Sequence, residues 1–177
     1  EGTMILDGAL VQNNYAFAQG GGIYNVGTLR IQNHSAVHTN GIGPIQMRPG
    51  RGVPTLSLTG GGILQAGFAT IEDSSDSGNQ SFQLGGAIHN TNDGSLTVQR
   101  SSLTFNRSER GGAILNGSGT VVLQNSDVEQ NTASVDGGGL VHEGTSMTIL
   151  ATTFVENEAG SAGGGAISNH APLTLVN

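Results

Sequence analysis

The stretch Leu84–Asn90, LGGAIHN, decides the fold because the same pattern returns along the chain. Close copies are RGGAILN at Arg110–Asn116 and GGGAISN at Gly163–Asn169, and looser copies are GGGIYN at Gly20–Asn25, GGGILQ at Gly60–Gln65 and GGGLVH at Gly137–His142. The apolar residues that follow the glycines are Ile23, Ile63, Ile88, Ile114, Leu140 and Ile167, with spacings of 40, 25, 26, 26 and 27 residues. A constant period of this length is typical of a solenoid, in which each repeat packs on its neighbours.

A second apolar segment follows in each period and has the alternation of a β-strand. Three copies align without gaps: LTVQRSSLTFN at Leu96–Asn106, VVLQNSDVEQN at Val121–Asn131 and MTILATTFVEN at Met147–Asn157. Their first and third residues are apolar, which is the period of two expected of a strand with one buried face. On TMILDGALVQN, Thr3–Asn13, the same frame places Leu10 at the apolar eighth position and Asn13 at the closing asparagine.

No helical period is present, so each repeat is expected to hold about three short strands joined by turns. We therefore predict an all-β chain that forms a parallel β-helix of about six coils of ~26 residues. Neighbouring coils should stack about 4.8 Å apart through backbone hydrogen bonds. One copy departs from the pattern, because Asp76 falls where the others bury an apolar residue. We expect the coil to be distorted or opened there.

A single domain over residues 1–177 is expected, with an inserted loop at 41–59. This loop accounts for the one long spacing, and it holds three of the four prolines. The sequence begins inside one coil and stops inside another, at Leu173–Asn177, so we expect it to be a fragment of a longer solenoid. Uncapped coil ends expose strand edges, which favour end-to-end or subunit assembly.

The glycines are expected where the backbone bends with positive φ, or where it packs too closely against the next coil for a Cβ. Two residues after each repeated apolar position comes a polar one. These six residues are Asn25, Gln65, Asn90, Asn116, His142 and Asn169. Side-chain amides stacked at one height can hydrogen-bond along the rod, so we predict a structural polar ladder.

These repeats resemble those of the chlamydial polymorphic outer-membrane proteins, which pair GGA[ILV] with FxxN. GGAI stands at Gly85–Ile88, Gly111–Ile114 and Gly164–Ile167, and FxxN is literal at Phe154–Asn157. Similar repeats occur in bacterial surface proteins described as right-handed parallel β-helix repeat proteins, within the pectin-lyase-like superfamily. The resemblance covers nearly the whole chain except the inserted loop. It implies a right-handed β-helix in a secreted or surface-displayed protein, often an adhesin passenger or a structural stalk.

Composition excludes several classes of function. The chain has no cysteine and no lysine, so it can form neither a disulfide nor a thiolate metal site, nor a phosphate loop that requires a lysine. A formal net charge of −7 argues against a nucleic-acid partner. No run of 18 apolar residues is present, so no membrane span is expected in this segment.

Carboxylates offer the main candidates for catalysis, because polysaccharide lyases and hydrolases cluster acidic residues on one face. Glu72, Asp73 and Asp76 form one group, in which Glu72 and Asp73 should point to opposite faces. Alignment of the coils places Arg100 above Asp73, as a surface ion pair. Asp127 and Glu129 share a side with no basic neighbour. The five histidines, His34, His38, His89, His142 and His170, occupy different columns, so we expect neither a metal nor a cofactor.

We predict a non-catalytic structural or adhesive rod, located outside the cell or on a bacterial outer surface, either as a rigid rod that displays a loop or as a subunit of an extracellular assembly. The alternative is a polysaccharide lyase or glycoside hydrolase of the pectin-lyase-like type. Contacts with proteins or surface glycans are expected. The inserted loop is the candidate interaction site, because Met47, Arg48 and Arg51 project from an otherwise acidic rod and long solenoid loops commonly carry binding.

Overall fold

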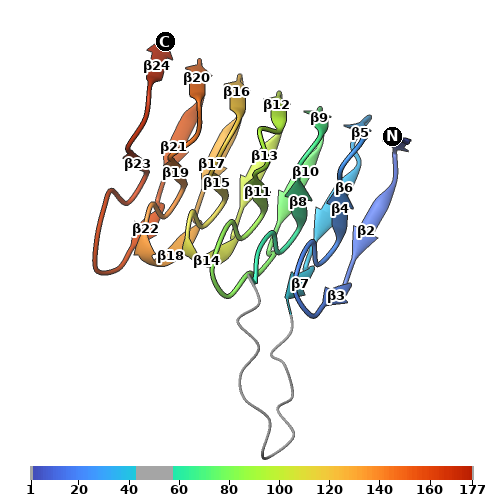
Figure 1. Ribbon diagram of the computed structural model, residues 1–177, viewed down its shortest axis with the longest axis horizontal. Helices are drawn as coiled ribbons and strands as arrows, with labels where there is room; N and C mark the ends of the chain where they lie inside the picture. The colour runs from blue at the N-terminus through green and yellow to red at the C-terminus, as the bar shows by residue number, and fades with distance from the viewer. Residues whose placement is uncertain (1, 43–57, 177) are drawn as a thin grey trace, which may run out of the picture.

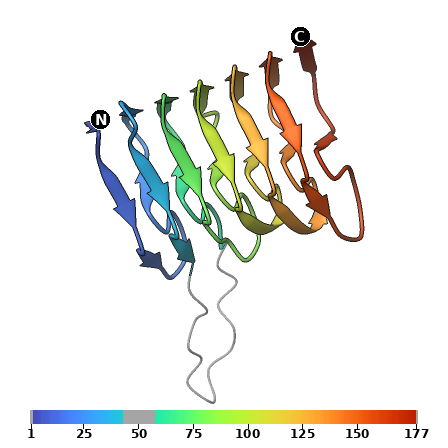
Figure 2. The ribbon, with the colours of Figure 1, turned by 180° about the vertical axis from the view of Figure 1, so that it is seen from behind.

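The computed structural model describes residues 2–42 and 58–176, and in this part of the chain every regular element is a β-strand. All strand pairs are parallel, and the chain winds through about six turns of a right-handed β-helix (Figure 1). Figure 2 shows from behind that the coils follow one another along the rod in sequence order. The predicted fold class is therefore confirmed.

Four stacked columns of strands form the walls, named here sheets D, A, B and C in the order in which each coil visits them. Sheet D contains β4 (Ile23–Asn25), β8 (Ile63–Gln65), β11 (Ile88–Asn90), β15 (Ile114–Asn116), β19 (Leu140–His142) and β23 (Ile167–Asn169). Sheet A contains β1 (Thr3–Asp7), β5 (Thr28–Gln32), β9 (Phe68–Glu72), β12 (Ser95–Gln99), β16 (Thr120–Gln124), β20 (Ser146–Leu150) and β24 (Leu173–Val176). The strands of sheet D are thus the glycine-repeat segments.

The other two columns complete the coil. Sheet B contains β2 (Leu10–Gln12), β6 (Ala36–His38), β10 (Ser75–Ser77), β13 (Ser102–Thr104), β17 (Asp127–Glu129) and β21 (Thr153–Val155). Sheet C is in two parts, β3 (Tyr15–Ala16) with β7 (Gly41–Ile42), and β14 (Arg107–Arg110) with β18 (Thr132–Asp136) and β22 (Glu158–Ala159). Between the two parts, Gln80 bridges Gly41 and Arg107 without a full strand.

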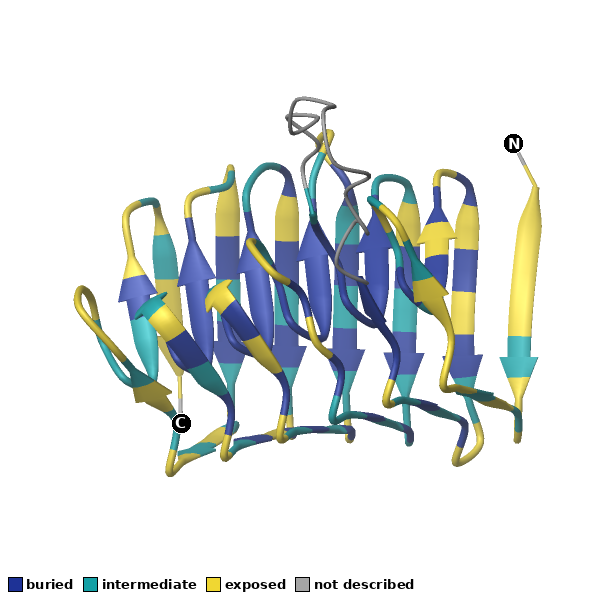
Figure 3. Cartoon of the chain, turned by 90° about the horizontal axis from the view of Figure 1, so that it is seen from below, coloured by how far each residue is buried: buried dark blue, intermediate teal, exposed yellow. Residues whose placement is uncertain are grey.

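The core is a narrow aliphatic column enclosed by sheets A, B and D. Every second residue of each sheet A strand points inward, as in Leu96 and Val98 of β12, and sheets D and B add Ile88 and Leu103. Figure 3 shows these buried positions repeating at the same height from coil to coil. Each inward residue therefore packs against its counterparts in the coils above and below.

The glycine turns confirm both expected reasons for glycine. Gly111 has φ +64°, a conformation that side chains with a Cβ rarely adopt. Its neighbour Gly112 has ordinary φ, but a Cβ there would collide with the carbonyl oxygen of Gly138 in the next coil. The first glycine is required for the bend, and the second for the close stacking of coils.

The expected frame of the first coil is wrong by one residue. Met4 pairs with Leu29, so Met4 holds the first inward position of the segment. Val11 then takes the apolar eighth position, whereas Leu10 is exposed. The sequence alone did not reveal this shift, because Asn13 and Asn14 are adjacent and either one matches the closing asparagine of the segment. A shift of one residue in a strand exchanges its two faces. The error therefore reversed the predicted direction of the side chains in the strands of Thr3–Asn13.

Two further expectations about the coils need correction. The insertion is shorter than residues 41–59, because β7 begins at Gly41 and Thr59 already bridges Gln19 and Leu84. The coil at Asp76 is not opened, since Asp76 pairs in register with β6 and β13 and is 1% exposed. Met47, Arg48 and Arg51 lie outside the described residues.

Candidate functional site

Polar side chains inside the turns form ladders along the rod. Between sheets D and A, Asn90 Nδ2 donates to Asn116 Oδ1 at 2.9 Å, and Asn116 Nδ2 donates to His142 Nδ1 at 3.1 Å. Because Nδ1 of His142 accepts, Nε2 carries the proton and donates to the Pro172 carbonyl at 2.9 Å. These amides are buried, so each bond satisfies a group that has no water partner.

The other members of this predicted column are arranged differently. Asn25 Nδ2 donates to Gln65 Oε1 at 2.7 Å. Within the described residues no hydrogen bond joins Gln65 to Asn90, and Asn90 Oδ1 is buried without a partner. The longer side chain of Gln65 instead reaches the Ser95 carbonyl, at 3.4 Å. Asn169, in the last described coil, is exposed.

A second ladder, between sheets B and C, was only half visible in the sequence. Its members are Asn14, Asn40, Asn79, Asn106, Asn131 and Asn157. The backbone N–H and the Nδ2 of Asn106 both donate to Asn131 Oδ1, at 2.9 and 3.0 Å. Asn14, and not Asn13, is the first member. A recurrent asparagine at the end of each segment was the available signal, but its bonding between coils depends on side-chain direction.

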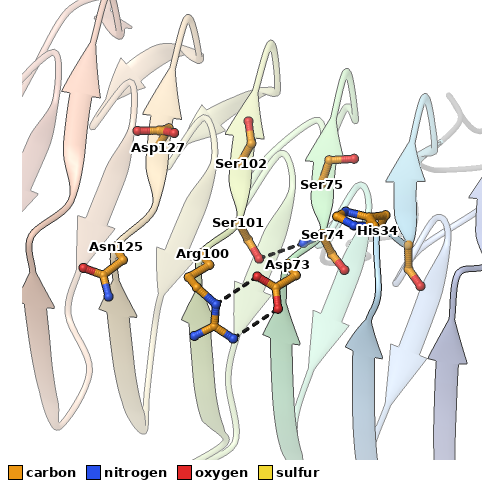
Figure 4. A pocket seen from close by; sticks show the side chains of 10 residues that line it. His34, Asp73, Ser74, Ser75, Arg100, Ser101, Ser102, Asn125 and Asp127 are labelled. Atoms are coloured by element: carbon orange, nitrogen blue, oxygen red, sulfur yellow. Dashed lines mark hydrogen bonds and ion pairs between the residues drawn. The ribbon is translucent and has the colours of Figure 1, made fainter.

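A groove runs over the turns that join sheets A and B, and its volume is about 450 Å³. Figure 4 shows the side chains that line it, which come from four successive coils. The lining residues are His34, Ser35, Asp73, Ser74, Ser75, Arg100, Ser101, Ser102, Asn125 and Asp127. The buried serines belong to a further ladder, in which the Ser74 N–H donates to Ser101 Oγ at 3.1 Å. The floor is therefore part of the scaffold, and the charged residues stand on its rim.

The predicted pair of Asp73 and Arg100 lies in this groove. Arg100 Nε donates to Asp73 Oδ1 at 2.9 Å, and Nη2 donates to Asp73 Oδ2 at 3.1 Å and to Glu72 Oε1. Glu72 and Asp73 thus approach the same guanidinium, and the expectation that they point to opposite faces is wrong. Asp73 has φ +46°, so the strand has already ended and its alternation no longer applies.

The charge state of the groove follows from this pairing. The hydrogen bonds from Arg100 hold the pKa of Asp73 below its ordinary value, and the bonds to Asp73 and Glu72 raise the pKa of Arg100. Asp73 therefore remains an ionised carboxylate at neutral pH. Such a group can accept hydrogen bonds, but it is a poor proton donor for cleavage of a glycosidic bond.

Asp76 does not join the other two carboxylates. It points into the core, where Asn79 Nδ2 donates to its Oδ1 and its Oδ2 has no partner. Burial raises the pKa of Asp76 well above its ordinary value. Asp127 lines the groove beyond Arg100, and Glu129 follows it on the same strand.

The histidines do not converge on a common ligand position. Across residues 2–42 and 58–176, no group of three or more histidine and acidic residues is placed to hold a metal ion. Burial lowers the pKa of His89 to about 4, so this ring is neutral at pH 7. His170 Nε2 lies 3.6 Å from Asp136 Oδ2.

In comparisons with known proteins, no family model, no curated protein and no solved structure matches this chain. The resemblance to the polymorphic outer-membrane protein repeat therefore rests on its motifs alone. In the described part of the chain, no helix is long and apolar enough to cross a membrane.

Proposed function

We propose that this chain is a non-catalytic β-helical rod with a structural or adhesive role outside a bacterial cell or on its surface. The observation that carries the proposal is the use of polar side chains between coils. Asparagines, serines and His142 bond to the equivalent residue or backbone of the next coil. Polar groups used in this way resist bending and sliding of the coils, which suits a stiff support.

The family resemblance supports the location and the role. GGAI and FxxN repeats are typical of secreted bacterial passengers and stalks, and this chain carries GGAI three times. The proposal places the rod in the group of right-handed β-helix surface proteins.

The alternative is a carbohydrate-active enzyme that uses the groove. A lyase or hydrolase requires a group that can give a proton and one that can remove it. In the groove, Arg100 binds both Glu72 and Asp73, which keeps Asp73 ionised. The geometry supports a fixed ion pair better than an acid and base that exchange protons.

One experiment separates the two functions. The rod is incubated with a panel of plant, bacterial and host polysaccharides, and released reducing ends and unsaturated products are measured. We expect no product above the level of an Asp73→Asn, Glu72→Gln double variant. Product that appears with the unaltered protein and disappears with this variant would establish the enzyme and overturn the rod.

A second measurement addresses the structural role directly. Electron microscopy of the protein isolated from its source cells should show rods of constant width that belong to surface structures or secreted fibres. Compact single particles inside the cytoplasm would contradict the proposal.

A further inference from the structure

The aromatic residues of this chain lie outside its core. The sequence has five phenylalanines and two tyrosines. Six of the seven are exposed, and only Phe154 packs against the core. Exposed rings give up about 2 kcal/mol each that burial would supply, so a group of them at one place calls for an explanation.

Two exposed rings, Tyr15 and Phe82, lie at the sheet C edge, near the start of the rod. Tyr15, on β3, is 74% exposed, and Phe82, two coils further on, is 44% exposed. Figure 1 shows β3 and β7 side by side at this edge, which continues into β14, β18 and β22.

A glycine between the rings opens a hollow. Tyr15 pairs with Gly41, and Gly41 bridges Gln80, so these three residues occupy one outward column. The absent side chain at Gly41 leaves a hollow of about 220 Å³ between Tyr15 and Phe82. A Cβ on Gly41 would already lie 3.1 Å from the Tyr15 ring. This glycine has no positive φ, so the bend of the chain does not require it.

The described residues that line the hollow are neutral. It consists of Tyr15, Thr39, Asn40, Gly41, Ile42, Gly78, Gln80 and Phe82, none of which is charged. Gln80 is exposed and presents an amide beside the two rings. The Thr39 hydroxyl donates to the His38 carbonyl at 2.7 Å, and its lone pairs can accept from a ligand. The hollow therefore combines apolar walls with neutral hydrogen-bonding groups.

We infer that this hollow binds a neutral sugar unit of a glycan. The negatively polarised face of an aromatic ring attracts the C–H groups on the face of a pyranose, while amides and hydroxyls bond to its hydroxyl groups. A charged glycan would meet no opposite charge from the described residues of this lining. The volume suits one or two sugar rings. The inference rests on the adhesive form of the proposed function, because it names what the rod would adhere to.

Binding can be measured at the site itself, since the chain has no tryptophan and only two tyrosines. In a Tyr24→Phe variant, Tyr15 is the only source of tyrosine fluorescence. This variant is titrated with neutral cello-, malto- and chito-oligosaccharides. We expect at least one series to change the Tyr15 emission in a saturable manner, and calorimetry on the unaltered protein to give the same affinity.

Three substitutions then test the walls and the floor. Tyr15→Ala, Phe82→Ala and Gly41→Thr should each weaken binding at least tenfold, the last because it fills the hollow. Phe68→Ala is the matched control, because Phe68 is 63% exposed on the outer face of sheet A, away from the hollow. It should leave affinity unchanged. Circular dichroism melts establish that each variant is folded, and the two alanine variants decide the matter if Gly41→Thr does not fold.

The failures are distinguishable from those of the proposed function. If no neutral oligosaccharide binds, or if only charged glycans bind, the sugar site is wrong while the rod stands. Equal loss of binding in Phe68→Ala and Tyr15→Ala would also overturn it, because binding would then not depend on the hollow. If binding is present and products are released as well, the non-catalytic rod fails and the sugar site remains.

Discussion

The later coils, built from β11–β22, and the earlier coils, built from β4–β10, follow the same backbone path. They differ in the side chains that fill their interior. In the later coils the sheet B strands bury Leu103 and Val128, and the sheet D amides bond in sequence. In the earlier coils Asp76 takes the place of these residues, Gln65 makes no bond to Asn90, and sheet C is interrupted. Register is nevertheless continuous from β6 through β10 to β13.

The comparison separates two properties of the rod. Register depends on the backbone hydrogen bonds of sheets A, B and D and on the glycine turns, which are present in both regions. Stability depends also on the side chains, which differ. A coil with a poor interior can therefore remain in place because its neighbours on both sides present matching backbones. We expect the earlier coils to be the weaker part of the rod, and the later ones to supply the stability that holds them.

Transfer of the acid to a later coil should have the largest effect. Leu103→Asp places a carboxylate three residues before Asn106, just as Asp76 precedes Asn79. We expect the free energy of unfolding at pH 7 to fall by about 5 kcal/mol, since a buried leucine is lost and a carboxyl is buried. Urea unfolding followed by circular dichroism measures this. A loss below about 1 kcal/mol would mean that any coil accepts an acid, and the contrast between the regions would disappear.

The reverse change should repair the earlier region. Asp76→Leu keeps the shape of the side chain and removes a buried carboxyl whose Oδ2 has no partner. Asn79 Nδ2 retains two acceptors, the Val37 carbonyl at 2.9 Å and Asn106 Oδ1 at 3.2 Å. We expect stability at pH 7 to rise by about 3 kcal/mol. A decrease would show that Asp76 has a structural role that leucine cannot replace.

The difference in the free energy of unfolding between the wild type and Asp76→Leu should depend on pH. Burial raises the pKa of Asp76 in the folded state, so the folded protein keeps this proton at a pH where the unfolded chain has lost it. The contribution of Asp76 to stability is therefore fully present below about pH 4 and is lost as pH rises through the folded pKa. The advantage of Asp76→Leu should be smallest near pH 4 and should grow by up to about 1.4 kcal/mol per pH unit.

Titrating groups that both proteins contain contribute equally to their stabilities, so they do not affect the difference between the wild type and Asp76→Leu. The lowered pKa of His89, about 4, opposes the trend, because its contribution is present above about pH 6.5 and falls as the pH drops towards 4. Both proteins contain His89, so subtraction removes its effect. A pH-independent difference between the wild type and Asp76→Leu would mean that Asp76 titrates alike in the folded and unfolded states.

The contrast also explains which features could be predicted from the sequence. Coil number, strand alternation and the glycine turns are backbone requirements that recur in every coil, so they appear as a period. The burial of Asp76 could not be predicted, because it depends on register supplied by the coils on either side. The shared approach of Glu72 and Asp73 to Arg100 depends on a left-handed residue that ends the strand early. The first coil was misread because Asn13 and Asn14 are adjacent and either one matches the closing asparagine of the segment.

The candidate sites follow the same rule. The Asp73–Arg100 pair was predictable from alignment of the coils, because both residues occupy the same position in successive repeats. The hollow beside Tyr15 could not be predicted. It depends on Gly41 in an outward-facing column, and the spacing of the repeats does not identify this glycine. Residues that depart from the repeat produce the features that differ from coil to coil. The side chains of the adjacent coils determine the local structure of those features.

Loss of a ladder hydrogen bond in the later coils should lower the free energy of unfolding by less than burial of a carboxylate does. Asn116 accepts from Asn90 and donates to His142, and its side chain is fully buried. Asn116→Leu should lower stability by about 2 kcal/mol, because both neighbours lose a partner in a dry environment. Asn169→Leu is the control, since that residue is exposed, and it should change stability by less than about 0.5 kcal/mol. Equal effects at the two positions would show that the ladder adds no stability.

The smallest effect should come from completing the ladder in the earlier region. Asn90 Oδ1 is buried without a partner, because the extra methylene of Gln65 carries its amide past this atom to the Ser95 carbonyl. Gln65→Asn gives this coil the residue used above and below it, so its Nδ2 can donate to Asn90 as Asn90 does to Asn116. We expect a gain of about 1 kcal/mol in urea unfolding. Gln65→Leu should instead destabilise, since Asn25 would lose its acceptor as well. A loss on Gln65→Asn would mean that the earlier coils are spaced for the longer amide, and that their irregularity extends to the backbone.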